Sequence, residues 1–127
     1  MGWCGLPERE FFSDAWWDAV LGAWNAADDA RLFAGAGTLQ FQLEGESPQT
    51  AWVNWDDQGR GTRVTASEPF TPLFRATEQQ WRDFVSGRID AKLAVLTGKL
   101  RFSGSLPRIL PYVRAFDALA AVARRSA

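Results

Sequence analysis

Residues 77–104 have the sequence TEQQWRDFVSGRIDAKLAVLTGKLRFSG, and this stretch decides the fold. It opens with a capping box, in which the Thr77 hydroxyl accepts from the Gln80 backbone while the Gln80 side chain returns to Thr77. Gly87 supplies the left-handed conformation that commonly stops a helix. The first part of the stretch therefore predicts one short amphipathic helix. Its apolar face consists of Trp81, Phe84 and Val85.

The second part of this stretch predicts another short helix and a strand. The helix covers about 90–97, and Gly98 stops it. Residues 99–103 then alternate between basic and apolar side chains, which is the period of a half-buried strand. A glycine and a serine at 104–105 turn the chain after the strand. We expect these positions to face the interior: Ile89, Leu93, Leu96, Leu100 and Phe102.

Upstream of this stretch, the sequence predicts one long helix followed by several strands. Ser13 is a good N-cap for a run of apolar residues at helical spacing, so we expect a helix over 13–33. Gly35 and Gly37 end that helix. The apolar period then changes from about four to two, and turn-forming residues separate the segments. The predicted strands cover residues 38–44, 51–57, 62–66 and 73–76, with a loop over 67–72.

The last segment carries a helical stripe of apolar residues from Leu106 to Ala120, and prolines interrupt it. Pro107 suits the first turn of a helix. Pro111 lacks the backbone donor that a helix interior needs. We therefore expect a kink near Pro111, or one helical turn followed by a restart there.

Together these elements predict a single α+β domain over residues 1–127, with residues 1–11 as a loose N-terminal arm. Three consecutive strands joined by short turns form an antiparallel meander. The complete sheet is expected to have five strands and to be mainly antiparallel. Helices grouped at the two ends of the chain would pack on one face of this sheet.

The composition leaves two interpretations of the interior open. The chain has 127 residues, of which 46% are apolar, seven are Trp and nine are Phe. Large aromatic side chains fill a core with few residues, but they also line pockets for apolar ligands. A net charge of −1 gives no reason to expect nucleic-acid binding. Residues 86–127 carry eight bases against two acids. This part is either a solvated face, which we favour, or a surface for transient contact with anionic membrane lipids or an acidic partner.

Side chains suited to catalysis are scarce in the sequence. It contains no His, which removes the usual zinc ligands and the Ser-His and Cys-His relays. The single Cys4 forms no intramolecular disulfide and fits a reducing compartment, so we expect a cytoplasmic protein. The neighbouring carboxylates at 28–29 and 56–57 point in different directions and are better explained as a helix end and a turn. We expect no enzymatic activity, no cofactor and no metal.

The order of the glycines and small residues in the late segment resembles the sterol carrier protein type 2 family. In both, a glycine ends one helix, a short helix with a small residue follows, and a Gly-Lys-Leu strand leads to another glycine turn. The matching positions here are Gly87, Ala94, Gly98, Lys99, Leu100 and Gly104. The resemblance covers about residues 12–125 and is sharp over 77–104.

This resemblance implies a hydrophobic tunnel between the sheet and the helices. It also implies non-enzymatic binding or carriage of a fatty acid, an acyl-CoA, a sterol or another isoprenoid, by a monomer or a weak homodimer. Inward strand positions and the helix positions facing them would line the tunnel. These positions are Leu39, Phe41, Val53, Trp81, Phe84, Leu93, Leu96, Leu100, Phe102, Ile109, Val113 and Phe116. The alternative is a packed interaction or scaffold domain of the same fold, whose tunnel is filled by aromatic side chains.

Overall fold

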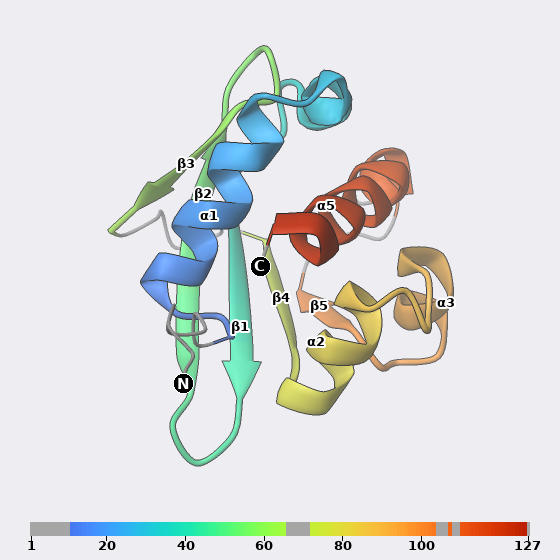
Figure 1. The fold of residues 1–127 in the computed structure, drawn as a ribbon. Coiled ribbons are helices and arrows are strands. Elements are labelled where there is room, and N and C mark those ends of the chain that lie inside the picture. The colour runs from blue at the N-terminus through green and yellow to red at the C-terminus, as the bar shows by residue number, and fades with distance from the viewer. Residues whose placement is uncertain (1–10, 66–71, 104–106, 108–109, 127) are drawn as a thin grey trace.

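The computed structural model describes residues 11–65, 72–103, 107 and 110–126 (Figure 1). The helices in this part are α1 (Asp14–Asn25), η1 (Asp28–Phe33), α2 (Glu78–Val85), α3 (Ala91–Leu96), η2 (Leu110–Tyr112) and α5 (Val113–Ser126), where η marks a 3-10 helix. The strands are β1 (Gly37–Glu44), β2 (Gln49–Trp55), β3 (Gly61–Val64), β4 (Leu73–Thr77) and β5 (Arg101–Ser103). The arm expected over 1–11, the loop over 67–72 and the turn at 104–105 lie outside the described residues, apart from Phe11 and Pro72.

The sheet has five strands in the order β3-β2-β1-β4-β5. The central strand β1 pairs antiparallel with β2 and parallel with β4, and the remaining pairs are antiparallel. The predicted meander is therefore confirmed as β1-β2-β3. The parallel pair was not predicted, because local turn residues give no signal for strands that lie far apart in the sequence.

One face of the sheet is buried and carries the core. Along β1, Leu39, Phe41 and Leu43 are buried, while Gln40 and Gln42 between them are partly exposed. The same alternation continues on the neighbouring strands. Their buried positions are Ala51, Val53, Trp55, Phe74 and Ala76. Helices α1, α2 and α5 cover this face (Figure 1). The expected α+β class, with helices packed on one face of a mainly antiparallel sheet, is confirmed.

Helix α1 is shorter than the helix expected over 13–33. Ser13 is its N-cap as predicted, since the hydroxyl accepts from the Trp16 backbone (3.2 Å). The helix ends at Asn25, Ala27 is extended, and η1 follows. The Trp24 side chain binds the Gly59 carbonyl between β2 and β3, and the Asn25 side chain binds Gly61 at the start of β3. These contacts hold the last turn, and the chain changes direction beyond it.

The decisive stretch at 77–104 forms as predicted at its start. Thr77 and Gln80 make both bonds of the capping box, at 3.2 Å and 3.0 Å. Helix α2 then buries Trp81 and Phe84, and Gly87 adopts a φ of +86° just beyond it. Three predicted features of α2 are therefore present in the structure: the N-terminal cap, the buried apolar face and the glycine that ends the helix.

Helix α3 corrects the expected orientation of its leucines. Leu93 and Leu96 are 50% and 64% exposed, so the prediction that they face the interior is wrong. Ala91 and Ala94 are buried instead, at 0% and 1% exposure. The Asp117 carboxylate of α5 accepts from the Ala91 backbone at 2.7 Å. The small alanine side chains let this short helix approach α5 closely. Because α3 packs through its alanine face, its two leucines are left in solvent.

The C-terminal helix is interrupted at Pro111. Of the two expected alternatives, a kink or one helical turn followed by a restart, the structure has the second. The single turn of η2 contains Pro111, and α5 begins at Val113. A proline in a first turn loses no intrahelical bond, which explains why the regular helix begins after it. No helix among the described residues combines the length and the apolar character needed to cross a bilayer.

Candidate functional site

A pocket lies between the helices and the buried face of the sheet. Its walls come from the segment preceding α1, from α1 itself, from α2, from α5 and from the centre of β1. The side chains that line it are Phe11, Phe12, Trp16, Trp17, Val20, Phe41, Trp81, Phe84, Val85, Phe116, Leu119, Ala120 and Ala123. Every one of them is apolar or aromatic. This wall contains no charged side chain. It is therefore suited to a ligand whose atoms inside the pocket are uncharged.

Aromatic rings from three elements meet around this pocket. Trp17 packs edge-on against Phe12 and Trp16, with ring centroids 5.3 Å and 5.1 Å apart. It also lies 5.2 Å from Phe41 at the centre of the sheet. Phe12 in turn approaches Trp81 of α2 at 5.5 Å. The first turns of α1 are therefore held to the sheet and to α2 mainly by ring contacts.

Phe12 is held in an unusual backbone conformation at the edge of the pocket. Its φ is +70°, in the left-handed region that bulky residues rarely occupy. Its side chain is nevertheless only 4% exposed, because the ring packs among its aromatic neighbours. Burial of the ring offsets a backbone cost of about 1–3 kcal/mol.

Two tryptophan N–H groups in the pocket wall differ in their partners. Trp81 Nε1 donates to the Gln42 carbonyl at 2.8 Å. Trp17 Nε1 is buried and has no hydrogen-bond partner among the described residues. A buried donor without a partner costs about 1–3 kcal/mol. The indole N–H that α1 contributes to the pocket wall therefore lacks the hydrogen bond that the α2 indole N–H makes.

The empty space enclosed by these side chains is small. The cavity volume is about 30 Å³. About 10–15 Å³ on this scale suffices for one water molecule. Sites for drug-sized ligands measure about 300–1,000 Å³. A lipid chain can enter only if some of the lining side chains move.

The structure brings together four of the twelve side chains that were expected to line a tunnel. Phe41, Trp81, Phe84 and Phe116 all lie in the pocket wall. Leu39, Val53 and Leu100 are buried, and Phe102 and Val113 partly buried, outside this wall. Leu93 and Leu96 are exposed on α3, and Ile109 lies outside the described residues.

The sequence prediction missed the contribution of α1 to the pocket. The run of apolar residues after Ser13, which includes Trp16 and Val20, was interpreted as the apolar face of a helix, but its distance along the chain from α5 concealed that the two helices meet. The pocket-lining residues of α5 beyond Phe116 were missed because they are small. A cluster of alanines opposite a cluster of tryptophans was the available signal: Ala120 and Ala123 leave the space that large rings partly fill.

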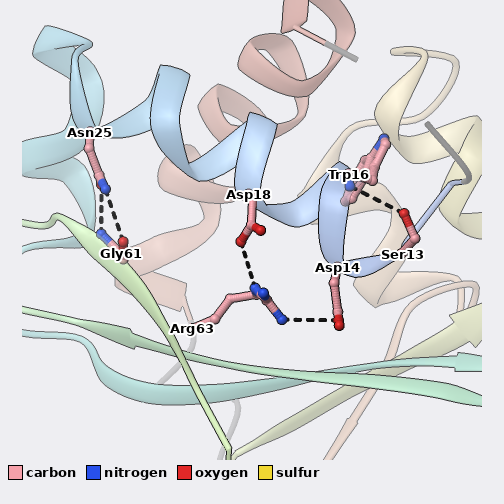
Figure 2. A network of polar contacts seen from close by, with 7 residues as sticks. All are labelled: Ser13, Asp14, Trp16, Asp18, Asn25, Gly61 and Arg63. Atoms are coloured by element: carbon pink, nitrogen blue, oxygen red, sulfur yellow. Dashed lines mark hydrogen bonds and ion pairs between the residues drawn. The ribbon is translucent and has the colours of Figure 1, made fainter. Parts of the chain in front are cut away.

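The opposite end of α1 is fixed by hydrogen bonds (Figure 2). Trp24 Nε1 donates to the Gly59 carbonyl at 2.9 Å. The Asn25 amide donates to the Gly61 carbonyl (2.9 Å) and accepts from the Gly61 backbone N–H (2.8 Å). Phe33, with its ring centroid 5.5 Å from that of Trp24, stacks on Trp55 with centroids 4.1 Å apart, and Trp55 Nε1 is buried without a hydrogen-bond partner among the described residues. This end is closed by directional bonds as well as by rings.

The first turns of α1 carry ion pairs on their outer side. Arg63 of β3 reaches Asp18 at 2.9 Å and Asp14 at 3.0 Å (Figure 2). The carboxylates are 64% and 89% exposed. Exposed pairs of this kind contribute about 0–1 kcal/mol each. They orient the helix but add little to the free energy that holds it in place.

The fold and this pocket can be compared with known proteins. A model of the SCP-2 sterol transfer family matches residues 18–117. The crystal structure of sterol carrier protein 2 is similar with a TM-score of 0.79 and 19% identity, covering 93% of this chain and 100% of that chain. No curated protein sequence matches the chain.

Two further solved structures have the same fold. One is a conserved hypothetical protein from Thermus thermophilus, described as possibly a sterol carrier protein, with a TM-score of 0.75 and 18% identity over 98% of this chain and 94% of that chain. The other is the UbiJ-SCP2 ubiquinone synthesis protein, with a TM-score of 0.60 and 13% identity over 96% and 98%. At these identities the structural likeness shows the shared fold.

Proposed function

This chain belongs to the SCP-2 sterol transfer family, and we propose that it binds or carries a lipid-like apolar ligand between its sheet and its helices. The ligand class is a fatty acid, an acyl-CoA, a sterol or another isoprenoid. The observation that carries the proposal is the composition of the pocket wall. Thirteen side chains from five segments converge there, and none of them is polar enough to prefer water. Transfer of apolar ligand surface out of water, at about 25 cal/mol per Å², would drive binding.

A role in binding without catalysis fits the same wall. A general acid or base must come within hydrogen-bond distance of the reacting atom. Among the described residues, no carboxylate, lysine or hydroxyl lines the pocket. The ion pairs of Arg63 lie on the exposed side of α1, away from the enclosed space.

The pocket has to enlarge before it holds a lipid chain. We propose that the first turns of α1, with Phe11 and Phe12 before them, form the wall that yields. Ring contacts and exposed ion pairs hold these turns, whereas directional hydrogen bonds hold the last turn at Trp24 and Asn25. Rings can slide and repack at small cost, but a buried hydrogen bond is lost completely when its partners separate.

The alternative function is a packed interaction or scaffold domain in which aromatic side chains fill the tunnel. The small cavity, about 30 Å³, favours it. The two proposals differ in one measurable respect. A ligand-binding pocket must open at low cost, whereas a filled tunnel stays closed in the presence of lipid.

A fatty-acid and a sterol titration would test the proposal. Trp16, Trp17 and Trp81 line the pocket, so a bound chain should change the intrinsic fluorescence, and native mass spectrometry should show the added mass. Saturable binding at micromolar ligand supports a lipid site. A protein that carries no lipid after purification and binds none in the titration supports the filled-tunnel alternative.

A pair of substitutions on α5 locates the binding. Ala120→Leu adds volume to the pocket wall and should weaken ligand binding at least about tenfold, the equivalent of one lost contact of about 1.4 kcal/mol. Ala121→Leu is the matched control, because Ala121 is partly exposed and does not line the pocket. Thermal unfolding of both variants checks that the added side chain is tolerated. Equal affinities of the two variants would show that the ligand binds elsewhere.

A further inference from the structure

Helix α3 presents two leucines to solvent on one side. Leu93 and Leu96 are 50% and 64% exposed, the largest exposed fractions among the big apolar side chains of the described residues. Residues three apart lie on the same face of a helix. Leu93 and Leu96 together form an apolar patch on this short helix. We call this pair of leucines the α3 patch.

The orientation of α3 is fixed, so the leucines cannot turn inward without loss of specific bonds. Asp90 caps the helix by accepting from the Leu93 backbone at 2.7 Å. Asp117 accepts from the Ala91 backbone at 2.7 Å. Ala91 and Ala94 fill the contact with the body of the protein. The exposed leucines are therefore a stable feature of the fold.

Basic side chains flank the α3 patch. Lys92 precedes Leu93, and Lys99 follows just after the helix; both are exposed. Within the part of the chain that the structure describes, neither lysine has an acidic partner at ion-pair distance. The nearest acid in sequence, Asp90, is engaged as the helix cap. The patch thus combines an apolar centre with a positive rim.

We propose that the α3 patch docks on an anionic bilayer surface. Leucines inserted at the boundary between head groups and acyl chains lose contact with water, and lysines extend their charge to the anionic head groups. The positive rim argues for this occupant over a second copy of the chain, because two such patches facing each other would place like charges together. The proposal stands independently of what the pocket binds.

Docking through α3 would also orient the molecule on the membrane. Helix α3 packs on α5, and α5 supplies Phe116, Leu119, Ala120 and Ala123 to the pocket. A bilayer held against α3 therefore lies one helix away from the pocket wall.

Vesicle co-sedimentation of the full chain tests this proposal. Phosphatidylcholine vesicles with and without phosphatidylserine provide the two surfaces, each at low and at high salt. We expect binding that requires phosphatidylserine and weakens with salt. No sedimentation with the anionic vesicles, or equal sedimentation with both vesicle types, would overturn the proposal.

Paired variants assign the binding to the α3 patch. Leu93→Ser with Leu96→Ser should reduce vesicle affinity at least about tenfold, and Lys92→Gln with Lys99→Gln about 25-fold, since each lysine near an anionic surface contributes about fivefold. Arg31→Gln with Arg60→Gln is the matched control. These two exposed bases lie on η1 and next to β3, well separated from α3 (Figure 1). The control should bind like the wild type.

Two outcomes of the variant series contradict the assignment. If the arginine control loses as much affinity as the lysine variant, net charge and not the α3 patch determines binding. If the leucine variant keeps its vesicle affinity but loses self-association in sedimentation velocity, the patch contacts a second copy of the chain. Because Leu93 and Leu96 are exposed, circular dichroism and thermal unfolding of their variant should match the wild type.

Discussion

Both ends of α1 bury tryptophan, but the two ends are held in different ways. At the last turn, Trp24 and Asn25 make three hydrogen bonds to the backbone at Gly59 and Gly61. At the first turns, Trp16 and Trp17 pack against other rings around a small cavity and make no side-chain hydrogen bond of this kind among the described residues. A buried indole N–H without a partner in the described part of the chain occurs at both ends, on Trp17 and on Trp55, so it does not distinguish them. One end is therefore fixed by directional bonds, and the other is held by contacts that can rearrange.

This difference shows how an aromatic core can be both packed and adaptable. Rings exclude water at either end, so burial alone does not distinguish them. The hydrogen bonds of the Trp24 indole and the Asn25 amide distinguish the two ends of α1, because they specify one position for the last turn. If a ligand enters this protein, we expect α1 to move about its Trp24 end.

The largest effect should come from a methyl group placed in the fixed end. A Cβ on Gly59 would overlap the Ala30 carbonyl group, and the φ of Gly59 is +85°. Gly59→Ala should therefore lower the free energy of unfolding by more than about 3 kcal/mol, or prevent folding. Gly98→Ala is the control, because it shares a positive φ (+75°) but has no atom within 4 Å of the added Cβ. Urea unfolding measures both, and equal losses would show that φ alone decides the cost.

A second comparison replaces the two kinds of tryptophan. Trp24→Phe leaves the Gly59 carbonyl without its donor, whereas Trp17→Phe removes an N–H that has no partner in the part of the chain that the structure describes. Both substitutions delete the same ring atoms. We expect Trp24→Phe to be more destabilising by about 1–3 kcal/mol in chemical denaturation. A Trp17 variant that loses as much stability as the Trp24 variant would contradict the proposed difference between the ends.

A smaller contrast separates part-buried polar contacts from exposed charges. Asn25→Ala removes both bonds to Gly61 and should cost about 1–2 kcal/mol. Arg63→Gln removes the ion pairs to Asp14 and Asp18 and should cost less than about 1 kcal/mol, because those carboxylates are exposed. Thermal unfolding at low and high salt distinguishes the two, since only the Arg63 contribution should be screened. A salt-dependent loss in the Asn25 variant would not fit this account.

The smallest effect concerns pH and originates away from both ends of α1. Burial raises the pKa of Asp117 above its usual range, the nearby Asp90 adds to the increase, and the Ala91 N–H opposes it. The folded chain then takes up this proton at higher pH than the unfolded chain, so the group lowers stability as pH rises through the raised pKa.

Asp117→Asn keeps an acceptor for Ala91 and should remove this pH dependence. We expect the variant to be at least as stable as the wild type at neutral pH, and the two unfolding curves to converge as the pH falls toward the ordinary aspartate range. Parallel stability profiles across this pH range would show that Asp117 does not titrate as inferred.

The sequence was sufficient where local signals and packing agree. Ser13 and the capping box at Thr77 were predicted, and an interruption at Pro111 was expected as either a kink or a restart, because each depends on a few neighbouring residues. The alternation along β1 predicted which of its side chains are buried, because the sheet is covered on one face. These features depend on short-range geometry that residue identity specifies directly.

The errors occurred where contacts between distant segments decide the outcome. Leu93 and Leu96 have the spacing of an inward face, but Ala91 and Ala94 allow closer packing on α5 and replace them in the interior. The parallel pairing of β1 with β4 and the meeting of α1 with α5 depend on the complete topology. The position of the pocket follows from these long-range contacts, which is why only part of its wall was predicted.

Hydrogen–deuterium exchange with and without a fatty acid tests whether α1 is fixed at its Trp24 end and can rearrange at its first turns. We predict that amides in the first half of α1 exchange faster than those of residues 21–25 in the free protein, since the side-chain bonds of the last turn are buried or part-buried, whereas the Arg63 bonds to the first turns are exposed. Ligand should then change protection at residues 11–20, 81–85 and 116–123 and leave 24–34 and 53–61 unchanged. Uniform exchange along α1, or changes confined to the Trp24 end, would contradict the account.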